Sequence, residues 1–203
     1  MSELAERAEA RRRRAVEILD ALRYLERWGR IGRAELAGSV RLGLVVAHDI
    51  DVEVVVEELD PTAAFGVAGE IAGDPRVVRV LYRNLTAKRG WLYWEIEVRC
   101  EDGDEWTIET YVNGPADPYR GWSVELADAL DRVLTEEQRE VILALKEALA
   151  DDEDYRSLDV YRAVVDGGVR TLDAFRAWRV EHGSAELVHW IPAAVTPART
   201  RDR

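Results

Sequence analysis

Two aspartates near the start of the chain have a spacing that suits metal-dependent phosphate chemistry. Asp49 and Asp51 lie in a β-branched, alternating segment, residues 45–56, which predicts a strand with one buried face. Alternate residues of a strand project to the same side, so the two carboxylates lie about 7 Å apart on one face. Such a pair repels itself unless a cation neutralises it, and its hard oxygens suit Mg²⁺ or Mn²⁺.

A glycine–serine pair, Gly38-Ser39, precedes the aspartates by about ten residues. Glycine lets a backbone approach a phosphate closely, its exposed N–H groups bind anions, and the serine hydroxyl adds a donor. We therefore expect a phosphate-binding turn, then one strand and a reversal, then the carboxylate strand. Arg41 follows closely, and either a triphosphate contact or a plain surface charge explains it.

The run from Gly38 to Val52 resembles the signature of the nucleotidyltransferase superfamily with the DNA polymerase β-like fold: Gly-Ser, about ten residues, then Asp-apolar-Asp-apolar. The chain is most similar to small members such as antibiotic or minimal nucleotidyltransferases. The resemblance implies an α/β (α+β) fold, with a mixed β-sheet core flanked by helices. It also implies transfer of a nucleoside monophosphate from an NTP, with ATP the expected donor, to a hydroxyl of a small molecule or protein.

The same resemblance implies a third carboxylate on a later strand, which is usually an aspartate. Glu109 occupies the matching place in the strand Trp106–Val112, one methylene longer than the usual residue. Glu95 and Glu97 on the preceding strand compete for this role, although a cross-strand ion pair explains them equally well. Glu53 continues the acidic face of the first strand and is expected to be a solvated edge residue.

Composition indicates a globular protein, since 47% of the 203 residues are hydrophobic. The net charge of -12 disfavours a long nucleic-acid substrate. Cys100 is the single cysteine, and the sequence has neither an apolar signal core nor a membrane-length apolar run. We therefore expect a cytoplasmic protein with no membrane contact. Glutamates flank the run Arg11–Arg14, which favours a solvated helix face over a nucleic-acid arm.

Hydrophobic periodicity predicts the elements around the aspartates. Residues 3–30 form one long helix, which could pair with a second copy of the chain, and residues 62–72 form another. Residues 76–85 suit a strand or a short helix, and two strands then form a hairpin across Glu101–Asp104. The predicted parts are an N-terminal helix (1–30), a nucleotidyltransferase core (31–121), a helical C-terminal part (122–191) and a flexible tail (192–203).

The C-terminal part has several helix-start signals. Thr135 and Gln138 form a capping box, and Ser157 and Thr171 can each cap a later helix. Acidic residues outnumber basic ones here, which suits a cationic acceptor or plain solubility equally well. Two other functions stay open: a non-catalytic nucleotide-binding or protein-interaction module of the same fold, and a toxin-type enzyme that modifies tRNA or a protein.

Overall fold

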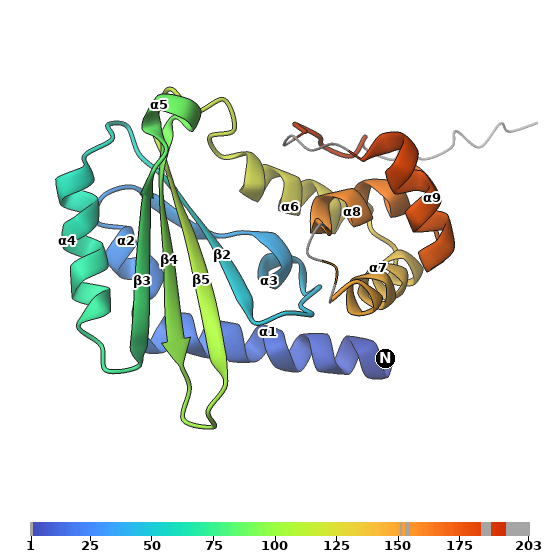
Figure 1. The fold of residues 1–203 in the computed structure, drawn as a ribbon, viewed down its shortest axis with the longest axis horizontal. Helices are drawn as coiled ribbons and strands as arrows, with labels where there is room; N and C mark the ends of the chain where they lie inside the picture. The colour runs from blue at the N-terminus through green and yellow to red at the C-terminus, as the bar shows by residue number, and fades with distance from the viewer. Residues whose placement is uncertain (1, 151, 153–154, 184–187, 194–203) are drawn as a thin grey trace, which may run out of the picture.

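The computed structural model describes residues 2–150, 152, 155–183 and 188–193, in which helices surround one mixed sheet (Figure 1). The predicted tail therefore lies almost entirely outside the described residues. In chain order the elements are α1 (Glu3–Ala21), α2 (Tyr24–Trp28), β1 (Arg33–Leu36), α3 (Gly38–Leu42), β2 (Asp49–Val55), α4 (Pro61–Ala72), β3 (Val77–Asn84), α5 (Thr86–Arg89), β4 (Trp91–Arg99), β5 (Glu105–Asn113), α6 (Trp122–Val133), α7 (Glu136–Ala148), α8 (Ser157–Val165) and α9 (Leu172–His182).

The five strands lie in the order β1-β2-β5-β4-β3. β5 is inserted between β2 and β4, pairs parallel with β2 and antiparallel with β4, and therefore brings two distant parts of the chain together. The β4–β5 hairpin matches the sequence prediction closely. The segment 76–85, whose conformation the sequence left open, is the edge strand β3, paired antiparallel with β4.

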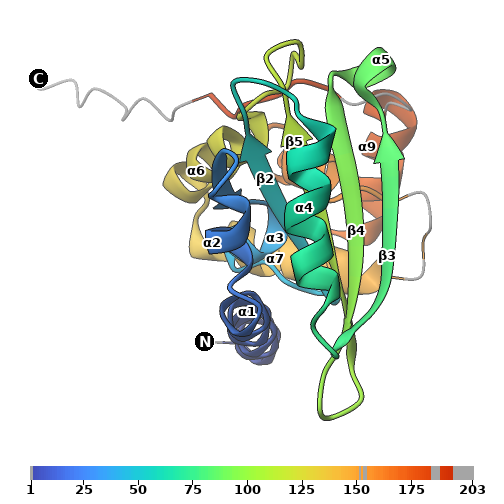
Figure 2. The same ribbon diagram turned by 90° about the vertical axis from the view of Figure 1, so that its left-hand side faces the viewer.

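One face of the sheet is covered by α1, α2 and α4, as the turned view in Figure 2 shows. Apolar residues at alternate strand positions, such as Ile50, Ile108 and Ile96, are fully buried beneath these helices. Trp28 of α2 packs against Trp94 of β4, with ring centroids 5.4 Å apart. This side of the sheet supplies the main hydrophobic core and fixes the positions of β2 and β5.

The helices α6 to α9 gather beside the opposite face and form a second cluster of buried apolar residues (Figure 1). The predicted capping box at Thr135 and Gln138 starts α7, and Thr171 caps α9. Ser157 does not act as a cap, because Arg156 occupies the cap position and no side chain bonds there. None of the helices in the described part of the chain is long and apolar enough to cross a membrane.

The prediction of one helix over residues 3–30 is wrong, because the helix breaks at Arg23, which has a left-handed backbone with φ of 48°. The break changes the chain direction, so that α1 is seen nearly end-on in Figure 2 while α2 lies above it, near α4. Tyr24 can then reach Thr110 of β5, with 2.6 Å between the two hydroxyl oxygens. No glycine or proline marks this position, so tertiary packing decides it.

The region before the aspartates also differs from its prediction. The expected loop contains β1, which pairs with β2, and Gly38-Ser39 opens the short helix α3 in place of a turn followed by a strand. The carboxylate strand begins at Asp49 and not at residue 45. A helix after the glycine turns the chain back within a few residues, so that β2 starts beside the segment that precedes it.

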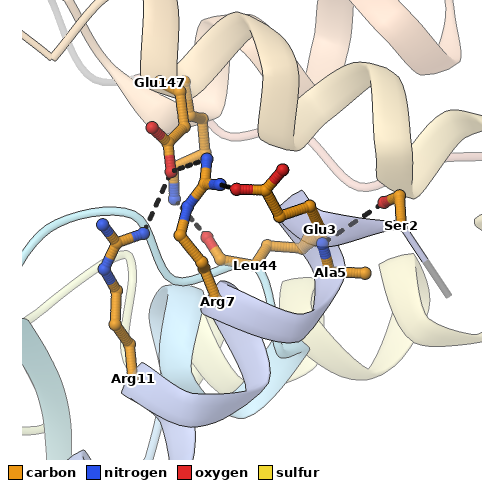
Figure 3. A network of polar contacts seen from close by, with 8 residues as sticks. Ser2, Glu3, Ala5, Arg7, Arg11, Leu44 and Glu147 are labelled. Atoms are coloured by element: carbon orange, nitrogen blue, oxygen red, sulfur yellow. Dashed lines mark hydrogen bonds and ion pairs between the residues drawn. The ribbon is translucent and has the colours of Figure 1, made fainter.

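Ion pairs join α1 to α7 across the end of the sheet. Figure 3 shows Arg7 and Arg11 of α1 directed at the same carboxylate oxygen of Glu147, at 3.3 and 3.0 Å. The arginine run that follows also pairs with acidic neighbours, as Arg12 does with Glu9, in agreement with the predicted solvated helix face. The contact at Glu147 holds α7 in place beside the start of β2.

Candidate active site

The pairing of β2 with β5 brings three carboxylates to one face of the sheet. Asp51 lies directly opposite Glu109 in the parallel register, and Asp49 shares their face because it lies two residues before Asp51. Between the two aspartates, Ile50 points the other way and is fully buried. The alternation predicted from the sequence therefore places the apolar side chain in the core and the acidic pair outside it.

Electrostatics at this face favour a bound cation. Burial raises the pKa of Asp51 to about 7, and repulsion by the carboxylates of Asp49 and then Glu109 adds to this effect. Attraction by Lys146 opposes the shift but does not cancel it. The free protein thus holds an acidic group whose ionised form is poorly stabilised, and a divalent cation would supply the missing positive charge.

The donor set suits a hard cation, but it is not arranged as a closed site. Among the described residues, no three acidic, histidine or cysteine side chains are grouped as a ready metal site. Glu109 is instead held by Tyr111, whose hydroxyl donates a hydrogen bond of 2.6 Å to its carboxylate. Asp49 and Asp51 therefore fit a divalent cation as a pair, and Glu109 would have to leave Tyr111 to join them.

The competing glutamates of β4 have partners of their own. Arg79 of β3 forms ion pairs with both Glu95 and Glu97, and its distance to the Glu97 carboxylate is 2.6 Å. Glu97 lies opposite Thr107 and Glu95 lies opposite Glu109, so β5 separates both glutamates from the aspartate strand. This geometry favours Glu109 as the third carboxylate and the cross-strand ion pair as the role of Glu95 and Glu97.

Gly38 lies in direct contact with the aspartate strand. Its φ is +57°, and a Cβ atom added there would lie 1.8 Å from Asp51 Oδ2. The neighbouring Ala37 N–H donates a 2.9 Å hydrogen bond to the Asp51 carbonyl, which fixes this approach. Ser39 is 4% exposed, and its hydroxyl has no hydrogen-bond partner in the described part of the chain. Because a side chain at position 38 would overlap Asp51, a glycine is required there.

Arg41 points away from this region. Its guanidinium donates to Asp128 of α6, at 2.9 and 2.6 Å, and to the carbonyl of Leu36 at 3.1 Å. It does not line the cavity beside Asp51 but a second, charged hollow between α1 and α7. The structure therefore shows a role for Arg41 in joining α3 to α6, outside the lining of the cavity beside Asp51.

A cavity of about 560 Å³ opens beside Asp51, between the sheet and α6 and α8. Gly38 and Asp51 line one part of it, and Lys88 and Arg89 of α5 line another. Both cations are exposed, and in the amino-acid sequence only their charge distinguishes them. Aromatic walls come from Trp91, Tyr111, Tyr119, Trp122 and Tyr161.

Lys146 of α7 is a candidate site residue that the sequence analysis missed. Its side chain is 4% exposed, and Nζ donates a 2.7 Å hydrogen bond to the carbonyl of Leu44. Burial lowers the pKa of Lys146 to about 8, although attraction by Asp49 and Asp51 opposes this. The available signal was a lysine on the apolar face of an amphipathic helix, four residues after the buried Ile142.

The prediction that Glu53 is a solvated edge residue is wrong. Glu53 is 2% exposed, and its carboxylate accepts hydrogen bonds from the backbone N–H groups of Gly121 at 2.8 Å and Val124 at 3.3 Å. Because β1 covers one side of β2 and α6 begins over its face, this position is enclosed. Glu53 therefore ties the aspartate strand to the helix that forms the cavity wall.

Comparison with known proteins gives matches in structure only. No family profile and no curated protein sequence matches the chain. A chain of the GLD-2/RNP-8 complex superposes with a TM-score of 0.55 at 12% identity, over 89% of this chain and 68% of that one. The Cid1 poly(U) polymerase gives a TM-score of 0.56 at 14% identity, over 80% of this chain and 53% of its own.

A Cid1 structure described for its RNA terminal uridylyl transferase activity also matches, with a TM-score of 0.57 at 14% identity. The match covers 46% of the length of that Cid1 chain, so this protein spans about half the length of the Cid1 chains it matches. At these identities the comparison shows the fold alone, which this chain shares with the GLD-2 and Cid1 chains. The α/β fold predicted from the sequence is confirmed.

Proposed function

We propose that this protein is a metal-dependent nucleotidyltransferase that moves a nucleoside monophosphate from an NTP to a hydroxyl group and releases pyrophosphate. The observation that carries this proposal is the register of the two parallel strands, which sets Asp51 opposite Glu109 and beside Gly38. Solved Cid1 structures of the same fold contain a UTP analogue or MgGTP, which agrees with a triphosphate and a divalent cation here. ATP and Mg²⁺, with Mn²⁺ as an alternative, remain the expected pair.

Each side chain has a role in this proposal that follows from its position. Asp49 and Asp51 would hold the metal, which when bound neutralises phosphate charge. Gly38 and Ser39 would bind the triphosphate through backbone N–H groups and the free serine hydroxyl. Lys146 has one N–H donor bound to Leu44 and two left for phosphate oxygens.

The chemistry is a single displacement at the α-phosphorus. The acceptor oxygen forms a bond to this phosphorus, the bond to the bridging oxygen breaks, and pyrophosphate leaves with that oxygen. The acceptor hydroxyl must lose a proton, and the Glu109 carboxylate is the group on the sheet face placed to accept it. Glu109 would thus serve as base, or complete the metal shell once it leaves Tyr111.

The acceptor is a small molecule or a protein in the first form of this proposal, and one observation favours RNA as a second candidate. Trp91 and Tyr111 lie 4.9 Å apart between ring centroids, next to Tyr93, and the exposed cations Lys88 and Arg89 adjoin them. Aromatic rings beside cations suit a single strand of nucleic acid. Because Cid1 is named for RNA transfer, overall charge alone does not exclude such an acceptor.

Titration calorimetry of each NTP, with Mg²⁺, tests the nucleotide site before any acceptor is known. We expect micromolar binding to the wild type and a loss of about 100-fold or more in the Asp49→Asn/Asp51→Asn variant. A matched control is Asp102→Asn/Asp104→Asn, because this second Asp-x-Asp lies in the exposed β4–β5 turn. The control should bind like the wild type.

Outcomes of this titration separate the remaining functions. No binding to a folded wild type would overturn the nucleotidyltransferase proposal and leave a protein-interaction module of the same fold. Binding without pyrophosphate release, across small-molecule, protein and RNA acceptors, would favour a non-catalytic nucleotide-binding module. Release that depends on an RNA oligonucleotide, and that weakens steeply with salt, would establish the second candidate, including a toxin-type activity on tRNA.

A further inference from the structure

The end of the cavity away from Asp51 contains a pair of buried polar side chains, Asn113 and Asp117. They are 5% and 6% exposed, and both line the cavity. Asn113 ends β5, four residues beyond Glu109 and on the same face, which places it about 13 Å further along the strand. A ligand that reaches from the carboxylates through the cavity therefore meets this pair at its other end.

The orientation of the Asn113 amide is fixed by its partner. Its Nδ2 donates to Asp117 Oδ2, while Asp117 Oδ1 accepts a 2.8 Å hydrogen bond from the backbone N–H of Tyr119. An ionised carboxylate only accepts, so the amide nitrogen must face Asp117 and the amide oxygen must face away. The backbone of Asp117 lies so close to Gly90 that a Cβ atom added to this glycine would be only 2.7 Å from the Asp117 nitrogen.

This arrangement leaves one hydrogen-bond acceptor without a partner. Asn113 Oδ1 is buried and bonds to no other described residue. An unpaired buried polar atom costs free energy and calls for an explanation, and a ligand in the cavity that Asn113 lines would supply one. The missing partner must be a donor, which excludes a phosphate oxygen and indicates a hydroxyl or amino group.

We infer that Asn113 is a specificity-determining residue, whose Oδ1 accepts a hydrogen bond from a hydroxyl or amino group on the nucleoside part of the bound nucleotide. The inference rests on the proposed function, since the triphosphate is assigned to the end that contains Gly38 and Asp51. The sugar and the base then occupy the stretch between that end and Asn113. Asp117 acts through Asn113 as a positioning residue, because it decides which amide atom faces the ligand.

Analogue binding identifies the donor. The probes are the NTP that the wild type binds best and analogues of it that each lack one donor: the 2′-deoxy form, the 3′-deoxy form, and a form without the exocyclic amino or ring N–H group of the base. We expect one analogue to bind the wild type about tenfold more weakly, because it leaves the Asn113 oxygen unpaired. The sugar analogues and the base analogue distinguish the two sources of the donor.

The Asp117→Asn variant tests the orientation itself. Its new amide can donate to Asn113, whose own amide then turns and presents Nδ2 to the ligand in place of Oδ1. We expect the discrimination to fall below about threefold in this variant, whereas the Asp102→Asn control, in the β4–β5 turn, should keep it. Asn113→Ser removes the amide and should abolish the same discrimination, if Asp117→Asn melts too early to be used.

Two results would overturn the inference while the proposed function stands: all analogues bind the wild type within about twofold, or the discrimination persists unchanged in both Asn113→Ser and Asp117→Asn. A wild type that binds no nucleotide would overturn the inference and the proposed function together. Calorimetry reports all of these outcomes without any need for an acceptor.

Discussion

The two faces of the sheet differ in what their side chains do, although the same strands build both. On the face under α1, α2 and α4, residues such as Ile50 and Trp94 are fully buried among apolar neighbours. On the other face the same strands present Asp51, which lines the cavity, and Glu109, which is only partly buried. One face is close-packed among apolar side chains, and the other brings acidic groups together beside a cavity.

This difference shows how the fold accommodates an unfavourable site. Burial of Asp51 and repulsion by the neighbouring carboxylates, which together raise its pKa, destabilise the free protein. The packed face offsets that cost and keeps β2 and β5 in register despite the repulsion. The comparison predicts that substitutions on the packed face reduce stability, and that substitutions on the acidic face reduce ligand binding or even increase stability.

Two tryptophans on opposite faces of β4 give the largest expected effect. Trp94→Ala leaves a cavity against Trp28 and Tyr82 and should lower the free energy of unfolding by about 3–5 kcal/mol. Trp91→Ala, on the acidic face and only partly buried, should cost under about 2 kcal/mol but weaken ligand affinity. Urea unfolding and calorimetry measure the two effects. Equal destabilisation by both substitutions would contradict the contrast between the faces.

Asp51→Asn should stabilise the metal-free protein in a pH-dependent way. The folded pKa of about 7 exceeds the ordinary value of 3.8, so the folded state binds more protons between these pH values. The contribution of Asp51 to the free energy of unfolding is therefore fully present below about pH 4 and is lost as the pH rises through 7. At pH 8 the variant should be more stable than the wild type by about 1–3 kcal/mol, and near pH 4 the difference should vanish.

Urea unfolding at these two pH values, in the absence of divalent cations, measures this effect. Added Mg²⁺ should stabilise the wild type and leave the variant unchanged, because ligand binding to the folded state raises its stability. A variant that is less stable than the wild type at pH 8 would show that Asp51 contributes favourable contacts and not repulsion.

Lys146→Met gives the smallest of these effects. Methionine keeps the packing of α7 but removes the positive charge and the two free N–H donors near the aspartates. NTP affinity should fall about tenfold, while stability should change little because the buried charge is itself costly. Calorimetry measures the affinity, and Arg176→Met, at an exposed position of α9 that does not line the cavity, is the control for loss of a positive charge. Unchanged affinity in Lys146→Met would remove the lysine from the nucleotide site.

Local sequence signals predicted the elements that local physics determines. The capping box at Thr135, the β4–β5 hairpin and the alternation around Asp49 and Asp51 all depend on residues close together in the chain, and the structure contains each of them. The conformation of β3 was left open by its sequence, because its polar and apolar residues mix on an edge strand and only pairing with β4 decides it.

The features that the sequence did not reveal depend on packing between distant segments. Arg23 breaks the first helix because α2 must turn onto the sheet, and Glu53 is buried because the start of α6 lies over it. Lys146 lies close enough to interact with the aspartates because of the position of α7, which an ion pair at Glu147 joins to α1. For the same reason Arg41, close to Gly38 in sequence, is directed at Asp128 in space.

The insertion of β5 between β2 and β4 has a consequence for the order in which the molecule assembles. Asp51 meets Glu109 only through a parallel pairing that spans roughly sixty residues, and such distant contacts form late because closing long loops is entropically costly. The β4–β5 hairpin is local and can form early. The strand β5, which contains Glu109, would then already be paired with β4 when β2 adds to its other edge. The repelling carboxylates then approach each other only in the last steps of folding, when the packed face is already in place to hold them.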